Sequence, residues 1–242
     1  MTRRLLSVAM LAAAAVGVSA APAWGQTQAA TTALSESAQR FGALYVPIDL
    51  SLEAAIAGFD KEFEPAIRAD ANVVALDQRF PGLIDAAGKA GRDAMTRTMR
   101  RELPATQQRV AALAGARFTL AELDGINAYL ASSSGQRLQR VMAETADGSA
   151  LSAEMRETGN TPELDGTKLL AMVNPAALGR LTKDELASLI QFSASPAGRK
   201  FDATGGELAE LVAAEMNNII AAMKPDIEQA VVGAITAHLG QK

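Results

Sequence analysis

One pattern of residues occurs twice in this chain and constrains its fold more than any other feature. The first copy consists of Phe118-Thr119-Leu120-Ala121-Glu122-Leu123 followed by Tyr129, Ser132 and Gly135. The second consists of Leu181-Thr182-Lys183-Asp184-Glu185-Leu186 followed by Phe192, Ser195 and Gly198. A constant offset of 63 residues aligns Thr, Glu, Leu, Ser and Gly in the two copies. The pattern therefore predicts an internal repeat of two related structural units.

Each copy begins with a signal for the start of a helix. Thr119 and Glu122 form a capping box, in which the hydroxyl accepts from the N3 amide and the carboxylate accepts from the cap amide. The flanking apolar residues Phe118 and Leu123 complete a hydrophobic staple. The second copy has the same four roles in Leu181, Thr182, Glu185 and Leu186. We therefore expect helices to begin directly after Thr119 and Thr182.

The end of each copy predicts a sharp corner between two helices. Ser195 is a favourable N-cap residue and Pro196 suits the first helical position, so one helix ends here and another begins at once. Ser132 has the same role in the first copy, without the proline. Gly135 and Gly198 fall at N3 of the new helices, where a missing side chain lets two backbones approach closely. The side chains expected to fill the corners are Tyr129, Leu138, Phe192 and Phe201.

The remainder of the chain is also typical of helices. Apolar residues recur at steps of three and four, and period-two alternation is absent. We predict an all-α bundle of about eight to ten helices, in one domain over residues 26–242, with repeat units at about 110–158 and 168–224. Gly115 is expected to end a helix, and Pro104 and Pro225 are each expected to begin one. The segment 159–167 is the expected loop between the repeats.

The second copy resembles a known family. Residues 181–201 read Leu-Thr-x-x-Glu-Leu, an aromatic residue, then Ser-Pro-x-Gly-Arg-Lys-Phe, which is similar to the signature of the bacterial exported domain of unknown function 2059. The first copy departs from it with Ser133 for the proline and Gln136-Arg137 for Arg-Lys. The resemblance covers mainly residues 110–215 and implies an all-helical, exported Gram-negative protein. That family has no established activity, so it supplies no catalytic residues.

The N-terminus is typical of a secretory signal peptide. Arg3 and Arg4 precede an apolar stretch over 5–18, and small residues follow before a cleavage point after Gly25 or, alternatively, after Ala20. We predict export to the periplasm, by the general secretory route rather than the twin-arginine route, and no transmembrane segment in the mature chain. The chain has no cysteine, which excludes disulfides and thiolate metal sites.

The charge argues against a nucleic-acid partner. The net charge of the chain is −4, and residues 1–25 carry two arginines and no acid, so the chain without them has a charge of −6. Binding to phosphate backbones relies on clustered Lys and Arg. We therefore expect a protein, lipid or small apolar ligand of the cell envelope as the partner, with methionines at 172, 216 and 223 lending plasticity to any pocket.

The repeated residues also invite catalytic hypotheses. Glu122 and Glu185 resemble a carboxylate pair, and Ser132 and Ser195 resemble nucleophiles. Capping explains all four, because no nucleophile elbow surrounds either serine and His238 is the single histidine. One histidine without cysteine gives no familiar metal site. We therefore expect no catalytic, cofactor-binding or metal residues. A carboxylate-dependent envelope hydrolase is the alternative, and a self-associating structural module is another.

One charged set is a candidate contact for an anionic surface. Arg97, Arg100 and Arg101 share a helix with Lys89 and Arg92, and they form a positive face on an acidic protein. Anionic lipid headgroups or an acidic cell-wall polymer would suit such a face. The other interpretation is a solvated face whose charge is balanced by acids of neighbouring helices.

Overall fold

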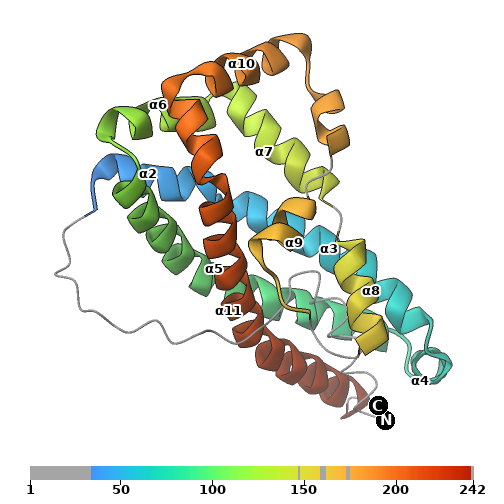
Figure 1. Cartoon of the computed structure of the whole chain (residues 1–242). Coiled ribbons are helices and arrows are strands. Elements are labelled where there is room, and N and C mark those ends of the chain that lie inside the picture. Colours follow the sequence, from blue (N-terminus) through green and yellow to red (C-terminus); the bar gives the residue numbers. More distant parts are fainter. Residues whose placement is uncertain (1–33, 147, 159–161, 173–174, 241–242) are drawn as a thin grey trace.

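We describe the fold from a computed structural model, in which residues 34–146, 148–158, 162–172 and 175–240 are described (Figure 1). The predicted signal peptide, residues 1–25, lies outside these residues. The helices are α2 (Glu36–Tyr45), α3 (Ile48–Arg68), α4 (Ala71–Arg79), α5 (Leu83–Arg117), α6 (Leu120–Ala131), α7 (Ser133–Thr145), α8 (Ser149–Thr158), α9 (Gly166–Ala171), the 3-10 helix η1 (Pro175–Arg180), α10 (Lys183–Ala194) and α11 (Pro196–Gly240). These residues contain no strand, so the predicted all-α bundle is confirmed.

The long helices α5 and α11 form the centre of the bundle and run antiparallel (Figure 1). A ladder of three ion pairs joins them: Arg117 with Glu207, Arg109 with Glu215, and Arg101 with Asp226. The basic partners recur every eight residues along α5, which separates successive pairs by about 12 Å along the helix axis. The ladder therefore fixes the register of α5 against α11.

Two prolines do not begin helices as the sequence suggests. Pro104 lies inside α5 and Pro225 lies inside α11. An interior proline loses one backbone hydrogen bond and costs roughly 3 kcal/mol. Both rings face solvent, however, while buried residues on either side, such as Leu103 and Val110 in α5, continue the apolar stripe. Packing of these stripes offsets the local cost, so the predicted breaks do not occur.

The predicted helix end at Gly115 is also wrong. The helix α5 continues through this glycine to Arg117 and ends at Phe118, whose backbone is extended (φ −112°, ψ 144°). Phe118 is buried, and its ring lies 5.9 Å from that of Phe41. At Gly115 an added side chain would meet only ordinary contacts, so this position does not require glycine. The end of α5 is instead set by the burial of Phe118 and by the Thr119 cap that follows it.

The main hydrophobic core draws on α2, α5, α6 and α11. Phe41 of α2 is fully buried near its middle, with rings of Tyr45, Phe118 and Phe201 within 6.2 Å between centroids. Aromatic pairs at these separations add roughly 0.5–1.5 kcal/mol beyond their burial. The two copies of the repeated pattern are attached to this core by Phe118 and Phe201.

The segment between the two copies is docked on α11 by a buried asparagine. The Asn217 side-chain amide donates to the Leu164 carbonyl at 2.8 Å, and its oxygen accepts from the Leu164 amide at 3.2 Å. Asn217 and Leu164 are each 4% exposed. The expected loop over 159–167 is non-helical at 162–165, where it is held by these bonds, and residues 159–161 lie outside the described part.

One described segment, Glu36–Lys61, is long and apolar enough by length and composition to cross a membrane. It comprises α2 and the first part of α3, which are separated at Val46 and Pro47. Its residues Phe41 and Phe59 are fully buried in the core. Core helices of globular proteins meet the same criterion, so this is weak evidence for a span. The absence of a transmembrane segment from the mature chain stays a prediction.

Candidate functional site

Both predicted capping boxes are present. The Thr119 amide donates to the Glu122 carboxylate at 2.7 Å, and the Glu122 amide donates to the Thr119 hydroxyl at 3.3 Å. Thr182 and Glu185 form the same two bonds at 2.7 Å and 3.3 Å. The backbone angles of the two threonines agree within two degrees. The predicted starts of α6 and α10 are therefore confirmed.

Both predicted corners are also present. The Ser132 hydroxyl accepts from the Gly135 amide at 3.1 Å, and the Ser195 hydroxyl accepts from the Gly198 amide at 3.0 Å. Ser132 has φ −68° and ψ 159°, and Ser195 has φ −71° and ψ 156°. A methyl group on either glycine would lie under 3.0 Å from the carbonyl oxygen of Tyr129 or Phe192, respectively. The two glycines are therefore required by the close approach of the backbone at each corner.

The two units pack against each other in a crossed arrangement. The helix α6 contacts α11, and α10 contacts α7. At the crossing, the rings of Tyr129 and Phe192 are stacked, with centroids 4.1 Å apart and planes inclined by 4°. The predicted corner aromatics thus meet each other across the two units. That the two units are an internal repeat stays a prediction.

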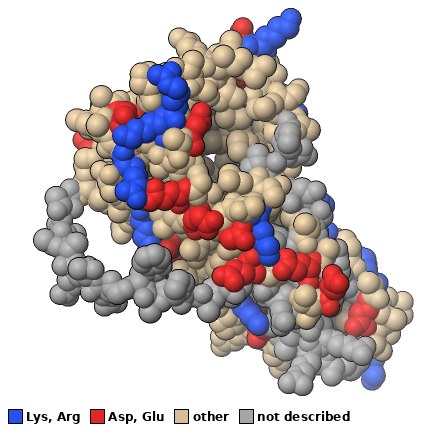
Figure 2. Space-filling model, in the orientation of Figure 1, with Lys and Arg blue, Asp and Glu red and all other residues tan. Residues whose placement is uncertain are grey.

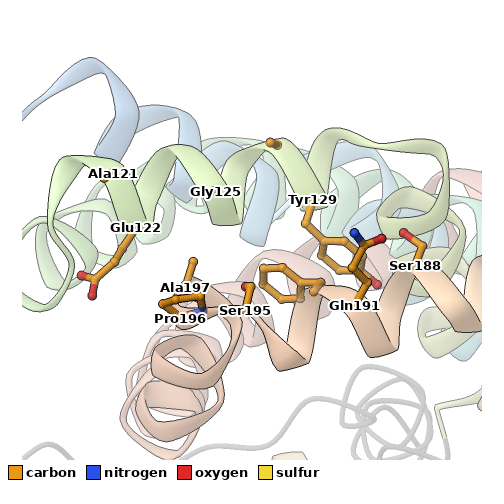
Figure 3. A pocket seen from close by; sticks show the side chains of 11 residues that line it. Ala121, Glu122, Gly125, Tyr129, Ser188, Gln191, Ser195, Pro196 and Ala197 are labelled. Atoms are coloured by element: carbon orange, nitrogen blue, oxygen red, sulfur yellow. The ribbon is translucent and has the colours of Figure 1, made fainter.

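A groove of about 610 Å³ lies along this crossing (Figure 3). Small side chains of α6 form one wall, and polar and aromatic side chains of α10 and the start of α11 form the other. The lining residues are Ala121, Glu122, Gly125, Ala128, Tyr129, Ser188, Gln191, Phe192, Ser195, Pro196 and Ala197. The repeated pattern thereby contributes Glu122, Ser195 and the stacked aromatic pair to one site, whereas Thr182 and Glu185 do not line it.

One polar atom of the groove lacks a partner. Tyr129 is 9% exposed, and its hydroxyl is buried without a hydrogen bond. Burial also raises the pKa of this phenol, so the hydroxyl is a neutral donor at neutral pH. A buried hydroxyl without a partner costs roughly 1–3 kcal/mol. Figure 3 shows the ring directed from α6 toward α10, with the exposed Gln191 beside it.

Glu122 is unsuited to acid catalysis. Its carboxylate accepts from the Thr119 amide and lies 3.2 Å from the Lys200 ammonium. The hydrogen bond from the Thr119 amide, followed by the hydrogen bond from the Lys200 ammonium, holds the pKa of Glu122 below its ordinary value. A general acid requires a raised pKa, so this carboxylate is held in the wrong protonation state. The capping interpretation of Glu122 is confirmed by its geometry.

The depressed pKa of Glu122 predicts a measurable acid sensitivity. A carboxylate that is more acidic when folded stabilises the fold above its unfolded pKa, near 4.5, and this contribution is lost as the pH falls through the folded pKa. Replacement of Glu122 by Gln keeps an acceptor for the Thr119 amide and removes the charge. We expect the variant to lose less stability than the parent between pH 5 and pH 3, as measured by urea unfolding. An equal loss in both proteins contradicts this assignment.

The remaining catalytic candidates are occupied in structural roles. The Ser132 and Ser195 hydroxyls cap α7 and α11. A ring nitrogen of His238 lies 3.1 Å from the Pro81 carbonyl oxygen, which joins α11 to the turn before α5. No group of three or more His, Cys, Asp or Glu with metal-binding geometry occurs among the described residues.

One of the three arginines predicted to contact an anionic surface is already paired with acids of the same chain. Arg101 pairs with Glu102 and Asp226, and its neighbour Arg92 pairs with Asp60. Arg97 and Arg100 are exposed and have no ion pair within the described part of the chain. Figure 2 shows both signs interspersed on the face over α11, with a diagonal acidic band beside clustered Lys and Arg. The anionic contact of these arginines stays a prediction.

Sequence reasoning missed the α10 wall of the groove. Ser188 and Gln191 carry no motif, and the apolar period marks Gln191 only as an outward position of a helix. The stacking of Tyr129 of α6 on Phe192 of α10 brings these side chains to the groove, and it joins residues more than sixty positions apart. The one available signal was the aromatic at the same place in each copy, which marked the position of the stack.

No family model, curated protein or solved structure matches this chain. The resemblance to the domain of unknown function 2059 is therefore neither supported nor contradicted and stays a prediction.

Proposed function

We propose that this protein is a non-enzymatic, exported binding module of the cell envelope, and that it holds a small, largely apolar ligand in the groove between α6 and α10. The observation that carries the proposal is the Tyr129 hydroxyl, which is buried, unpartnered and part of the groove lining. The groove volume of about 610 Å³ lies within the range of small-molecule sites, roughly 300–1,000 Å³.

The lining indicates the chemistry of the ligand. Ala121 and Ala128 leave room for an apolar body on the α6 side, and the Phe192 ring, stacked on Tyr129, adds apolar surface. The Tyr129 hydroxyl requires a hydrogen-bond acceptor, such as a carbonyl oxygen. Because this hydroxyl is covered, a ligand reaches it when a neighbouring side chain moves, and the exposed Gln191 is free to change rotamer. A neutral amphiphile with one acceptor group fits this set.

The polar groups of the groove are already hydrogen-bonded, which favours a binding role over a catalytic one. The carboxylate and the serine hydroxyl of the groove already accept hydrogen bonds from the backbone. Neither is paired with a base in the manner of an activated nucleophile. A carboxylate-dependent hydrolase would need two free carboxylates in one cleft, and Glu122 is the single acid in the groove lining.

The proposal predicts saturable binding of a neutral apolar probe. We expect the chain without residues 1–25 to bind N-phenyl-1-naphthylamine, detected by a rise in its fluorescence. Replacement of Ala128 by Trp fills the groove from an exposed position of α6 and should weaken binding at least tenfold. Replacement of Ala112 by Trp adds the same side chain at an exposed position of α5 outside the groove, and it should leave binding unchanged.

Two results contradict the proposal. One is the absence of saturable probe binding, and the other is an equal loss of binding in the Ala128 and Ala112 variants. Native mass spectrometry of protein taken from periplasmic extracts extends the test to the natural ligand. A bound species should accompany the parent protein and be absent from Ala128→Trp.

A further inference from the structure

The outer face of α10 exposes an apolar stripe. Leu186 is 38% exposed and Ile190 is 61% exposed, and no residue of this helix is buried. The exposed residues Ala187 and Ala194 continue the apolar stripe at steps of three and four, and the exposed Lys183 lies at its N-terminal end. This spacing places all five side chains along one side of the helix. The stripe faces away from the groove wall formed by Ser188, Gln191 and Phe192.

The corresponding face of α6 is covered by a helix of the same chain. The positions aligned with Leu186 and Ile190 are Leu123 and Asn127, and each is 2% exposed. The amphipathic helix α2 packs there. The Asn127 side-chain amide donates to the Ser37 carbonyl at 2.8 Å, and the Ser37 hydroxyl donates to Asp124 at 2.6 Å. This face of α6 therefore accepts an amphipathic helix, through polar contacts of Asn127 and Asp124 that are replaced by Ile190 and Ala187 on α10.

No helix has this role for α10 in the described residues. It packs on α7 and α11 and lies at the edge of the bundle (Figure 1). We propose that the occupant is α10 of a second copy of this chain, in an antiparallel, two-fold symmetric pair. In this pair the Leu186 side chain of one copy lies opposite Ile190 of the other. The stripe is thus complementary to itself, as a two-fold interface requires.

The charges at the two ends of α10 select the antiparallel arrangement. The exposed Asp184 lies in the first turn, and the exposed Arg199 lies just after the corner, where its guanidinium donates to the Ala194 carbonyl. In the first turn Lys183, Asp184 and Glu185 sum to one negative charge, and an antiparallel pair places this end of each copy at the same end as Arg199 of the other. A parallel pair brings like charges together at both ends. Complementary charge of this kind specifies orientation more than affinity.

The size of the stripe determines the strength of the pair. A helix of 12 residues is about 18 Å long. One helix pair of this length buries less than the roughly 800 Å² per partner of a standard stable interface. An interface of this size is in the class of weak, transient contacts, so the dimer should depend on protein concentration.

The absence of cysteine from the chain allows a direct test. Ala187 lies between Leu186 and Ile190, next to the two-fold axis of the proposed pair, and its side chain is exposed. We expect A187C to form a disulfide-linked dimer under mild oxidation at about 50 µM protein, since a weak pair forms only at high protein concentration. The matched control is D124C, at the aligned and exposed position of α6, which should stay monomeric. Equal rates of crosslinking in A187C and D124C overturn the proposal.

Sedimentation velocity provides a second test without a new thiol. The parent protein should shift from monomer toward dimer across a range of about 5 to 200 µM, since a weak pair depends on protein concentration. I190E places a charge in the stripe and should stay monomeric throughout. L170E changes a leucine of α9 that is 54% exposed and outside the stripe, and it should dimerise as the parent does. A parent that is monomeric at all concentrations overturns the proposal.

The outcome is independent of the groove function. The groove variant Ala128→Trp changes α6 on its groove side and should keep the dimer, whereas I190E should keep probe binding. A failure of either proposal is therefore visible without the other.

Discussion

Replacement of Gly198 by Ala should lower the free energy of unfolding by about 3 kcal/mol, because the corner between α10 and α11 has no room for a methyl group. The added Cβ would lie under 3.0 Å from the Phe192 carbonyl oxygen and from Ser193 Cα. These atoms belong to the backbone, so no side-chain rotation relieves the contact. The corner must open, which weakens the Ser195 cap and separates the stacked rings of Phe192 and Tyr129.

A second glycine of α11 offers a control substitution that should raise the free energy of unfolding. Gly205 lies in α11 with no atom within 4 Å of an added Cβ. Gly205→Ala should raise the stability by roughly 0.5–1 kcal/mol, because alanine favours the helix. Urea unfolding followed by circular dichroism suits all variants, since the single tryptophan, Trp24, lies in the predicted signal peptide. Equal effects of the two substitutions would show that the corner tolerates a side chain.

The caps and corners could be predicted from the sequence because they are local. A capping box needs only Thr119 and Glu122, and a serine cap at a corner needs only the residues that follow it. Dihedral preferences and short hydrogen bonds decide these features within four residues. For this reason the starts of α6 and α10 and the corners before α7 and α11 lie at the predicted positions.

Features that depend on distant residues could not be predicted in this way. The helices α5 and α11 continue through Pro104 and Pro225 because their buried stripes pack against each other, which a local rule for proline ignores. The groove depends on the packing of α6 beside α10 through Tyr129 and Phe192. Likewise, Leu123 and Leu186 have the same place in the pattern, yet one is buried and the other exposed, because α2 covers only the first.

The ion-pair ladder between α5 and α11 also depends on residues far apart in the chain. Its middle pair, Arg109 with Glu215, should contribute strongly to the stability of the fold. Glu215 is 7% exposed, and Arg109 is its ion-pair partner in the described structure. Arg109→Met removes the charge but keeps most of the apolar stem of the side chain. The Glu215 carboxylate then stays buried without its counter-charge. We expect a loss of about 2 kcal/mol, below the range for fully buried pairs because the Arg109 side chain is 55% exposed.

The double variant decides whether this loss reflects the ion pair. Glu215→Met together with Arg109→Met removes both charges, and two apolar side chains of similar volume should recover most of the stability. The double variant should therefore be more stable than Arg109→Met alone. Arg117→Met, in the exposed pair with Glu207, should have a smaller effect than Arg109→Met because water screens that pair. If Arg109→Met and the double variant are equally destabilised, the packing of the arginine stem, and not the charge of Glu215, holds α5 against α11.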